Sequence, residues 1–236
     1  MPGMSSAGWV QQLAGNFIVF DGPDGSGKST QFKRFARFAH DHGLTVNEVR
    51  EPGGTLIGEQ IRKILLDPAS EMSLRCEMLL YMASRAQLVE QVIAPALQRR
   101  ELVLADRFIS STLAYQGAAS GLPLDEILMV GEVAIGEHWP DLFVIFDVDE
   151  NTAARRMAGN GKDRKSNAAA TLPSLFADRL ELRGLEYQRR VREGFLAQAQ
   201  EKPDRYLVIN AAADPESVFE TLLAELQSRF ASADAR

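Results

Sequence analysis

Short apolar runs alternate along the chain with longer segments in which apolar residues recur every three or four positions. The first run, residues 17–20, ends at the turn-forming sequence Asp-Gly-Pro-Asp-Gly, as expected for a strand buried on both faces. In the segment that follows, Phe32, Phe35 and Phe38 recur at helical spacing and predict a helix. The same pattern predicts further strands over residues 45–49, 102–105, 142–148 and 206–209, and further helices over residues 56–66, 77–97, 124–135, 175–200 and 215–230.

This alternation predicts an α/β fold in which a parallel five-stranded sheet lies between two layers of helices. Because no linker separates two apolar cores, we expect residues 16–236 to form a single domain. Residues 1–15 are small and polar apart from Trp9 and Val10, and we expect a flexible N-terminal extension there. Residues 158–173 lack a sustained apolar face, which predicts a mobile insertion.

Charge and cysteine content limit which partners the protein is expected to bind and where in the cell it is expected to lie. The 236 residues include 26 Lys and Arg against 32 Asp and Glu, a net charge of −6, so the chain as a whole would repel a nucleic acid. No apolar run approaches the roughly 18 residues that a membrane span needs, which argues against a membrane partner. The single cysteine, Cys76, cannot form an internal disulfide and fits a reducing compartment. We therefore expect a cytoplasmic location.

A phosphate-binding motif follows the first predicted strand. Residues 22–29 read Gly-Pro-Asp-Gly-Ser-Gly-Lys-Ser and match the P-loop pattern between a strand and a helix. Its glycines allow backbone N–H groups to point inward at a polyphosphate, and the helix N-terminus adds partial positive charge. Lys28 would then contact the outer phosphates, and the Ser29 hydroxyl would hold Mg²⁺. The alternative is a glycine-rich turn with a solvated lysine.

A carboxylate and a guanidinium follow the predicted strand over residues 102–105. Asp106 and Arg107 would lie at the carboxyl edge of the sheet, where ligands of open α/β folds bind. Asp106 could contact Mg²⁺ through its water shell, and Arg107 could hold an acceptor phosphate through two parallel hydrogen bonds. A surface ion pair is the alternative for these two residues.

Four separated motifs make the chain resemble the bacterial thymidylate kinases, a family of P-loop nucleoside monophosphate kinases. These motifs are the P-loop with Asp24, the segment Arg50-Glu51-Pro52-Gly53-Gly54-Thr55, the helix ending in Tyr81-Met82-Ala83-Ser84-Arg85, and the segment from Asp106 to Gly117. The resemblance implies a three-layer P-loop fold, transfer of the γ-phosphate of ATP to thymidine monophosphate (dTMP) with Mg²⁺, and a homodimer. It also implies a mobile lid, which corresponds here to about residues 155–178.

Tyr81 and Arg85 lie four positions apart and would share one face of a helix. The Tyr81 ring could stack on a base, and Arg85 could donate to a carbonyl at the pyrimidine edge, as the family's arginine does at this position. Taken alone, Tyr81 is more typical of a core residue of its helix, and it is Arg85, four residues on, that favours base binding. Thr112 and Gln116 offer further polar contacts, and the family places the residue at Tyr115 near the sugar, where its bulk favours deoxyribose.

The reaction needs cations at the two phosphate groups. Arg50 and Arg107 are the candidates for the acceptor phosphate. Asp24 lies so close to polyphosphate that we expect Mg²⁺, Arg50 or a substrate hydroxyl to balance its charge; in the family this position contacts the sugar 3′-hydroxyl. A turn-stabilising aspartate is the alternative. In the lid, the candidates for contact with the transferring phosphate are Arg156, Lys162, Arg164 and Arg179, of which Arg164 is our choice.

The candidate sites are therefore as follows. Catalytic roles are expected for Asp24, Lys28, Arg50, Arg107 and Arg164. ATP would be bound by Gly22, Pro23, Asp24, Gly25, Ser26, Gly27, Lys28, Ser29, Thr30, Asn210 and Ala211, the last two because the family holds adenine after its last strand. We expect dTMP to be bound by Asp24, Arg50, Pro52, Tyr81, Arg85, Arg107, Ser111, Thr112, Tyr115 and Gln116, and the metal by Ser29 and Asp106.

Two other functions compete with this interpretation. A deoxynucleoside kinase would phosphorylate an uncharged sugar hydroxyl and would not need Arg50 and Arg107 together. A non-catalytic ATP-binding module would use the P-loop fold for partner recognition alone.

Overall fold

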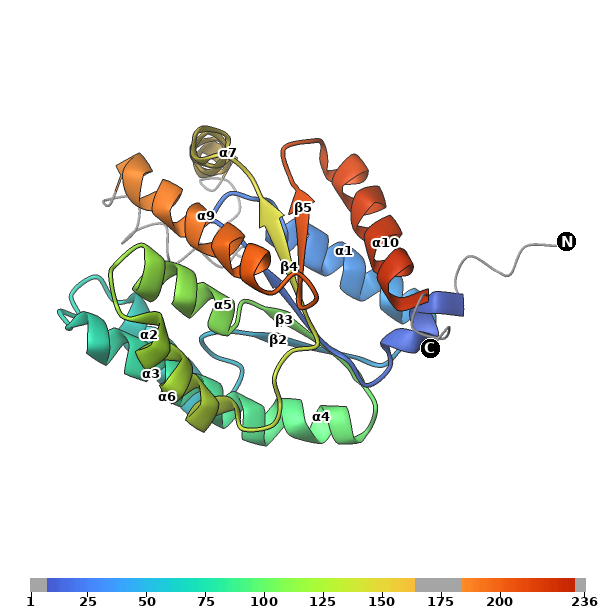
Figure 1. Ribbon diagram of the computed structural model, residues 1–236, viewed down its shortest axis with the longest axis horizontal. Coiled ribbons are helices and arrows are strands. Elements are labelled where there is room, and N and C mark those ends of the chain that lie inside the picture. The colour runs from blue at the N-terminus through green and yellow to red at the C-terminus, as the bar shows by residue number, and fades with distance from the viewer. Residues whose placement is uncertain (1–7, 164–183, 232–236) are drawn as a thin grey trace, which may run out of the picture.

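The computed structural model describes residues 8–163 and 184–231, and it confirms the predicted α/β architecture (Figure 1). Five strands form one sheet in the order β2-β3-β1-β4-β5, and every neighbouring pair is parallel. The strands are β1 (Phe17–Asp21), β2 (Val46–Arg50), β3 (Leu102–Asp106), β4 (Leu142–Asp147) and β5 (Tyr206–Asn210). Each strand ends in a polar residue, so the carboxyl edge of the sheet carries Asp21, Arg50, Asp106, Asp147 and Asn210.

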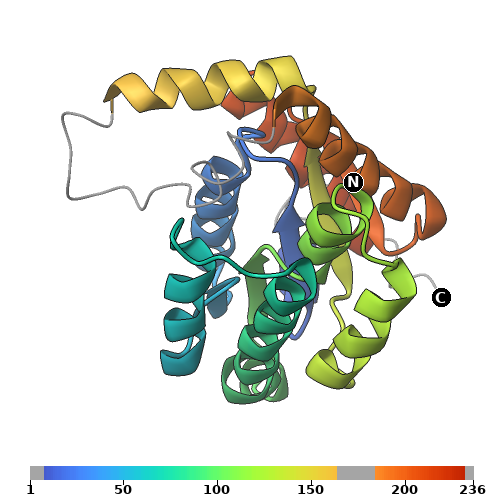
Figure 2. The same cartoon turned by 90° about the vertical axis from the view of Figure 1, so that its left-hand side faces the viewer.

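Helices connect these strands and cover both faces of the sheet (Figures 1 and 2). The α-helices are α1 (Lys28–Asp41), α2 (Leu56–Leu66), α3 (Leu74–Leu88), α4 (Ala94–Gln98), α5 (Ile109–Thr112), α6 (Leu124–Ile135), α7 (Glu150–Asp163), α9 (Gly184–Glu201) and α10 (Pro215–Ala231). Gly8–Leu13 forms a 3-10 helix, η1, and two π-helical segments are η2 (Val89–Ile93) and η3 (Leu113–Ala118). None of the described helices is long and apolar enough to cross a membrane.

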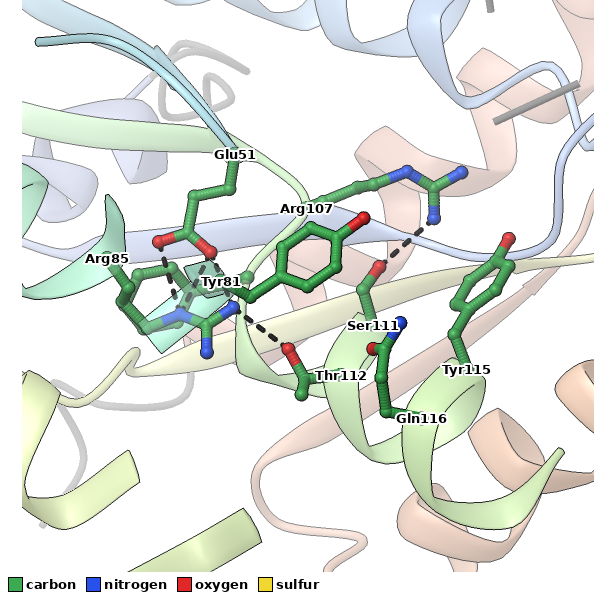
Figure 3. Close-up of a pocket in the computed structure, with 9 residues that line it drawn as sticks. Glu51, Tyr81, Arg85, Arg107, Ser111, Thr112, Tyr115 and Gln116 are labelled. Carbon is green, nitrogen blue, oxygen red and sulfur yellow. Dashed lines mark hydrogen bonds and ion pairs between the residues drawn. The ribbon is translucent and has the colours of Figure 1, made fainter. Parts of the chain in front are cut away.

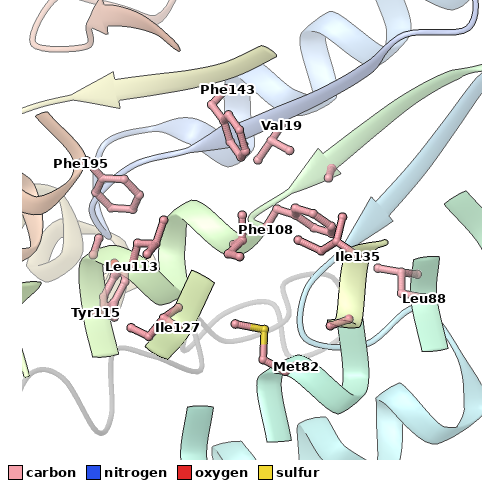
Figure 4. Packing of buried hydrophobic residues seen from close by; sticks show 14 of the residues in the cluster. Val19, Met82, Leu88, Phe108, Leu113, Tyr115, Ile127, Ile135, Phe143 and Phe195 are labelled. Carbon is pink, nitrogen blue, oxygen red and sulfur yellow. The ribbon is translucent and has the colours of Figure 1, made fainter. Parts of the chain in front are cut away.

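The central strand β1 divides the buried apolar side chains between two cores. Phe17 and Val19 belong to one core, whereas Ile18 and Phe20 belong to the other, as the alternation of side chains along a strand requires. The first core includes side chains of helices α3, α6 and α9. Its aromatic residues include Phe108, Tyr115, Phe143 and Phe195 (Figure 4). The second core packs against α1, α10 and η1. This double burial explains why the strands read as continuous apolar runs.

Three expectations about element boundaries are wrong. The expected flexible extension is instead helical over Gly8–Leu13, because Trp9, Val10 and Leu13 are buried in the second core. The single helix expected over residues 77–97 is divided by the π-helical segment η2. Pro95 lacks a backbone N–H and crowds the carbonyl four residues earlier, which accounts for the wider turn just before it.

The start of the expected mobile insertion is also helical. Asp149 Oδ1 accepts hydrogen bonds from the backbone N–H groups of Asn151 and Thr152, at 3.1 and 2.9 Å, and so caps helix α7. The helix continues to Asp163 and so includes the first six residues of the expected insertion. Residues 164–183 lie outside the described part of the chain, as do the remainder of the expected lid and the first residues of the helix expected over 175–200.

Candidate active site

The phosphate loop runs from β1 to α1 in close contact with the β4–α7 connection. A Cβ atom on Gly22 would lie 2.5 Å from the carbonyl oxygen of Phe146, and one on Gly25 would lie 2.5 Å from that of Ala153. Gly27 has a φ of 87° and immediately precedes α1, so the loop turns into the helix through the left-handed region. The geometry therefore places a curled backbone segment and a helix N-terminus at one point, which favours binding of an anion.

One buried polar atom of the loop supports a ligand there. Ser26 is 2% exposed, and its Oγ has no hydrogen-bond partner within the described residues. A buried hydroxyl without a partner costs free energy unless a ligand or water satisfies it. Thr30, also expected to bind ATP, lies in the first turn of α1 and is exposed.

Lys28 contacts the carboxylate of Asp106 across the β1–β3 pair. The parallel register places Asp106 opposite Phe20, one residue before the end of β1, and so brings the end of β3 to the phosphate loop. Burial would raise the pKa of Asp106, but the positive charges of Lys28 and Arg107 outweigh burial and hold this pKa below its usual value. Asp106 is therefore an anion at the mouth of the loop.

The Ser29 hydroxyl and the Asp106 carboxylate suit the magnesium ion that a P-loop implies. Ser29 is exposed in the first turn of α1, and Asp106 keeps 27% of its side chain exposed. Both supply oxygen atoms, the ligands that Mg²⁺ prefers, and Mg²⁺ takes its remaining ligands from phosphates and water. Within the described residues, no cluster of three or more His, Cys, Asp or Glu side chains could hold a metal ion.

Arg107 joins the phosphate loop to the neighbouring pocket. Its Nη2 donates to Asp24 Oδ1 at 2.6 Å, and its Nη1 donates to Asp21 Oδ1 at 3.2 Å and to Ser111 Oγ at 3.0 Å. Arg107, and not Arg50, therefore contacts Asp24 in this structure, and contact of Asp24 with Mg²⁺ or a substrate hydroxyl stays a prediction. Arg107 balances Asp24 because its left-handed backbone, with φ of 72°, directs the side chain over the loop.

Arg50 lies beside this pocket without lining it. Its Nη2 donates to Glu59 of α2 at 3.1 Å, and Glu59 also accepts the backbone N–H of Gly54 at 2.9 Å. Arg62, on the same helix, donates to the carbonyl oxygen of Pro52 at 2.6 Å. Burial and the like charge of Arg50 lower the pKa of Arg62. Arg50 at the end of β2 and Arg62 of α2 therefore place two cations beside this segment, and sequence analysis gave Arg62 no role.

The expected base-binding residues surround one narrow pocket, lined by Glu51, Tyr81, Arg85, Arg107, Phe108, Ser111, Thr112, Tyr115 and Gln116. The Glu51–Arg85 pair lies on one side of it, and Arg107, Ser111 and Tyr115 lie on the other (Figure 3). Tyr81 is 8% exposed, and burial raises its pKa, so its hydroxyl stays protonated. Tyr115 donates to Asp24 Oδ2 at 3.3 Å and so connects this pocket to the phosphate loop.

Arg85 is held by a buried carboxylate that sequence analysis did not assign. Glu51 accepts from Arg85 Nε at 2.9 Å and from Arg85 Nη2 at 2.6 Å. Arg85 is 1% exposed, and Glu51 is 5% exposed. Burial raises the pKa of Glu51 to about 7, although the positive charge of Arg85 opposes this shift. Arg85 Nη2 also donates to Thr112 Oγ1 at 3.2 Å, which fixes the guanidinium plane.

The residues expected near adenine lie at the end of β5. Arg156 of α7 donates to the backbone oxygens of Ala211, at 2.9 Å, and of Ser26, at 3.3 Å. This lid candidate therefore ties α7 to the phosphate loop and to the segment after Asn210. Figure 2 shows α7 crossing above α1 at this edge of the molecule. Arg164, our choice among the lid cations, and Arg179 lie outside the described residues.

The fold and site together define a P-loop phosphotransferase with two binding regions, a phosphate cradle and a polar pocket beside it, at one edge of a parallel sheet. Residues 20–222 match the family model described as thymidylate kinase. The chain belongs to the thymidylate kinase family.

Individual relatives agree with this assignment. A thymidylate kinase from Deinococcus radiodurans is 40% identical over 215 residues, which cover 91% of this chain and 98% of the relative. One from Pelotomaculum thermopropionicum is 44% identical over 201 residues, which cover 85% of this chain and 87% of the relative. The crystal structure of thymidylate kinase from Ehrlichia chaffeensis is similar with a TM-score of 0.69 and 31% identity, covering 90% of this chain and 98% of that one.

Proposed function

We propose that this protein transfers the γ-phosphate of ATP to dTMP and so forms thymidine diphosphate. The observation that carries the proposal is the position of Arg107, which contacts Asp24 in the phosphate loop and also lines the adjoining pocket. A kinase must bring two anionic substrates into line, and this side chain is shared between the two binding regions. Family membership supplies the identity of the substrates.

The phosphate loop would hold the triphosphate of ATP. Its backbone N–H groups and the α1 N-terminus face the phosphates, and Lys28 would move from Asp106 to the outer phosphates. Ser29 and Asp106 would hold Mg²⁺, which would offset the negative charge of the phosphates during the transfer. The backbone around Asn210 and Ala211 would contact adenine, with Arg156 closing that side of the site.

The pocket would hold dTMP with its phosphate toward Arg107 and Arg50. Asp24 would position the sugar, because it already accepts hydrogen bonds from Arg107 and Tyr115 at the junction of the two regions. The Tyr81 ring would stack on thymine, and Arg85 would donate to a ring carbonyl from Nη1, whose described partner is the weak acceptor Met82 Sδ. Ser111, Thr112 and Gln116 line the remaining polar wall, and Pro52, next to Glu51 in the sequence, accepts a hydrogen bond from Arg62 through its carbonyl oxygen.

We also propose that two copies associate through helices α3 and α6. These helices pack against each other and leave apolar side chains exposed: Leu79 by 51%, Met129 by 66% and Val133 by 86%. Exposed apolar side chains gathered on neighbouring helices are typical of protein interfaces. Light scattering after gel filtration tests this, since Val133→Lys should convert a dimer into a monomer. Cys76 is exposed and forms no disulfide, in keeping with a proposed cytoplasmic location.

The activity is tested by incubating the protein with ATP and Mg²⁺ plus either dTMP or thymidine, and resolving the products. With dTMP we expect one thymidine diphosphate and one ADP formed per ATP consumed, and with thymidine we expect no phosphorylated nucleoside. Phosphorylation of thymidine would indicate a deoxynucleoside kinase, and absence of product with every nucleotide would indicate a non-catalytic ATP-binding module. Arg85→Ala should raise KM for dTMP far more than KM for ATP, because Arg85 lines only the acceptor pocket.

A further inference from the structure

Glu77 of α3 holds one end of the Gln116 side-chain amide. Gln116 is 4% exposed, and its Nε2 donates to Glu77 Oε1 at 2.7 Å. An ionised carboxylate accepts hydrogen bonds and cannot donate them, so it binds the nitrogen end of the amide and not the oxygen end. Nothing in the described chain donates a hydrogen bond to Gln116 Oε1. The amide oxygen is therefore the end left for a ligand in the pocket that Gln116 lines.

The hydrogen-bonding groups of Arg85, which lines the same pocket, are similarly fixed. Glu51 takes its Nε and one N–H of Nη2, and Thr112 takes the other N–H of Nη2. Nη1 contacts Met82 Sδ at 3.0 Å, a weak acceptor that leaves a second N–H for a ligand. The pocket thus presents a hydrogen-bond donor from Arg85 and an acceptor from Gln116, and Thr112 lines the same pocket.

We propose that Glu77 is a positioning residue that determines which pyrimidine the pocket accepts. By fixing the Gln116 amide, Glu77 makes the pocket require an N–H group on the base beside the carbonyl that Arg85 contacts. Thymine has this pattern, a carbonyl at C4 beside an N3–H. Cytosine has the reverse pattern, an amino group beside a bare ring nitrogen. The proposal rests on the proposed function, because it assumes that the pocket binds dTMP.

Glu77 acts from outside the pocket. It lines a neighbouring hollow together with Met72, Ser120 and Tyr187, and it does not line the pocket itself. A carboxylate in this place has no other hydrogen-bond partner among the described side chains. The hydrogen bond to Gln116 is therefore the described contact through which Glu77 can orient a group in the pocket, which makes the proposal testable with a pair of variants.

The test compares Glu77→Gln with the wild type in steady-state assays with dTMP, dUMP and dCMP. A glutamine at position 77 can donate as well as accept, so the Gln116 amide is free to turn. We expect KM for dTMP to rise about threefold to tenfold, the loss of one hydrogen bond, while KM for ATP stays unchanged. The ratio of kcat/KM for dTMP over dCMP should fall by a similar factor. The ratio for dTMP over dUMP should not change, because these two bases share the same edge.

Two controls separate positioning from general damage. Glu90→Gln removes an exposed carboxylate in η2 and should leave both ratios and the KM for dTMP unchanged. In a Gln116→Ala background, Glu77→Gln should have no further effect, because the residue through which it acts is gone. Equal effects on the dCMP and dUMP ratios, or additive effects in the double variant, would overturn the proposal. If the wild type does not phosphorylate dTMP, the proposed function fails; if it does and Glu77→Gln matches Glu90→Gln, only this inference fails.

Discussion

Removing the Glu51 carboxylate should cost far more stability than removing a surface carboxylate. In Glu51→Ala, the Arg85 guanidinium would keep only Thr112, Met82 and the face of the Phe108 ring, 4.9 Å away, as partners. A buried charge that loses its counter-ion typically costs about 3–5 kcal/mol. Because the pocket admits water beside Arg85, we expect the lower end of that range, about 3 kcal/mol.

Urea unfolding followed by circular dichroism at pH 8 measures this difference. The matched control is Glu126→Ala, which breaks the exposed Arg75–Glu126 pair, 67% and 43% exposed, and should cost at most about 1 kcal/mol. The double variant Glu51→Ala/Arg85→Met removes both charges and should recover most of the lost stability. An equal loss in Glu51→Ala and Glu126→Ala, or no recovery in the double variant, would refute the assignment of Glu51 as the counter-ion of Arg85.

Three further predictions concern pH, the phosphate loop and catalysis. The pKa of Glu51 is raised by burial from 4.5 to about 7, so its contribution to the free energy of unfolding should fall as pH rises through that interval. In unfolding curves, the free energy of unfolding of the wild type minus that of Glu51→Gln should therefore decrease from pH 5 to pH 7, and an increase in this signed difference would contradict the prediction. Gly25→Ala combines a left-handed φ with a Cβ 2.5 Å from a backbone oxygen, whereas Gly121→Ala has only the former, so Gly25→Ala should lose more than the roughly 1 kcal/mol expected at Gly121 in urea unfolding. Lys28→Ala should lower kcat on the order of 100-fold or more with an unchanged circular dichroism spectrum, since it removes a charge from the transferring phosphate; a normal kcat would exclude that role.

The elements predicted correctly are those whose signal is local. Each strand is a continuous apolar run because both faces of the sheet are covered, and the phosphate loop is a contiguous motif between a strand and a helix. The 3-10 helix Gly8–Leu13 was not predicted, although Trp9, Val10 and Leu13 are apolar, because the residues around them are mostly small and polar. Pro95 was likewise a local signal, since it lies just after the π-helical segment that interrupts the expected helix.

The residues missed are those whose partners are distant in the sequence. Glu51 meets Arg85 across 34 positions, and Glu77 meets Gln116 across 39, so no local pattern links either pair. The balance of Asp24 by Arg107 depends on a backbone conformation that the sequence does not reveal. Motif matching therefore located the pocket, but not the carboxylates that hold its polar groups in place.

Three of the described cations at or near the phosphate loop already face a carboxylate: Lys28 faces Asp106, Arg107 faces Asp24, and the neighbouring Arg50 faces Glu59, whereas Arg156 contacts backbone oxygens. Such an edge has little net field at long range, so it would not gather polyanions indiscriminately from solution. To bind one of these cations, a ligand phosphate must instead displace the carboxylate with which that cation is paired. This exchange favours a ligand whose phosphate, sugar and base reach all of their partners together, and it predicts that capture of the nucleotide depends only weakly on ionic strength.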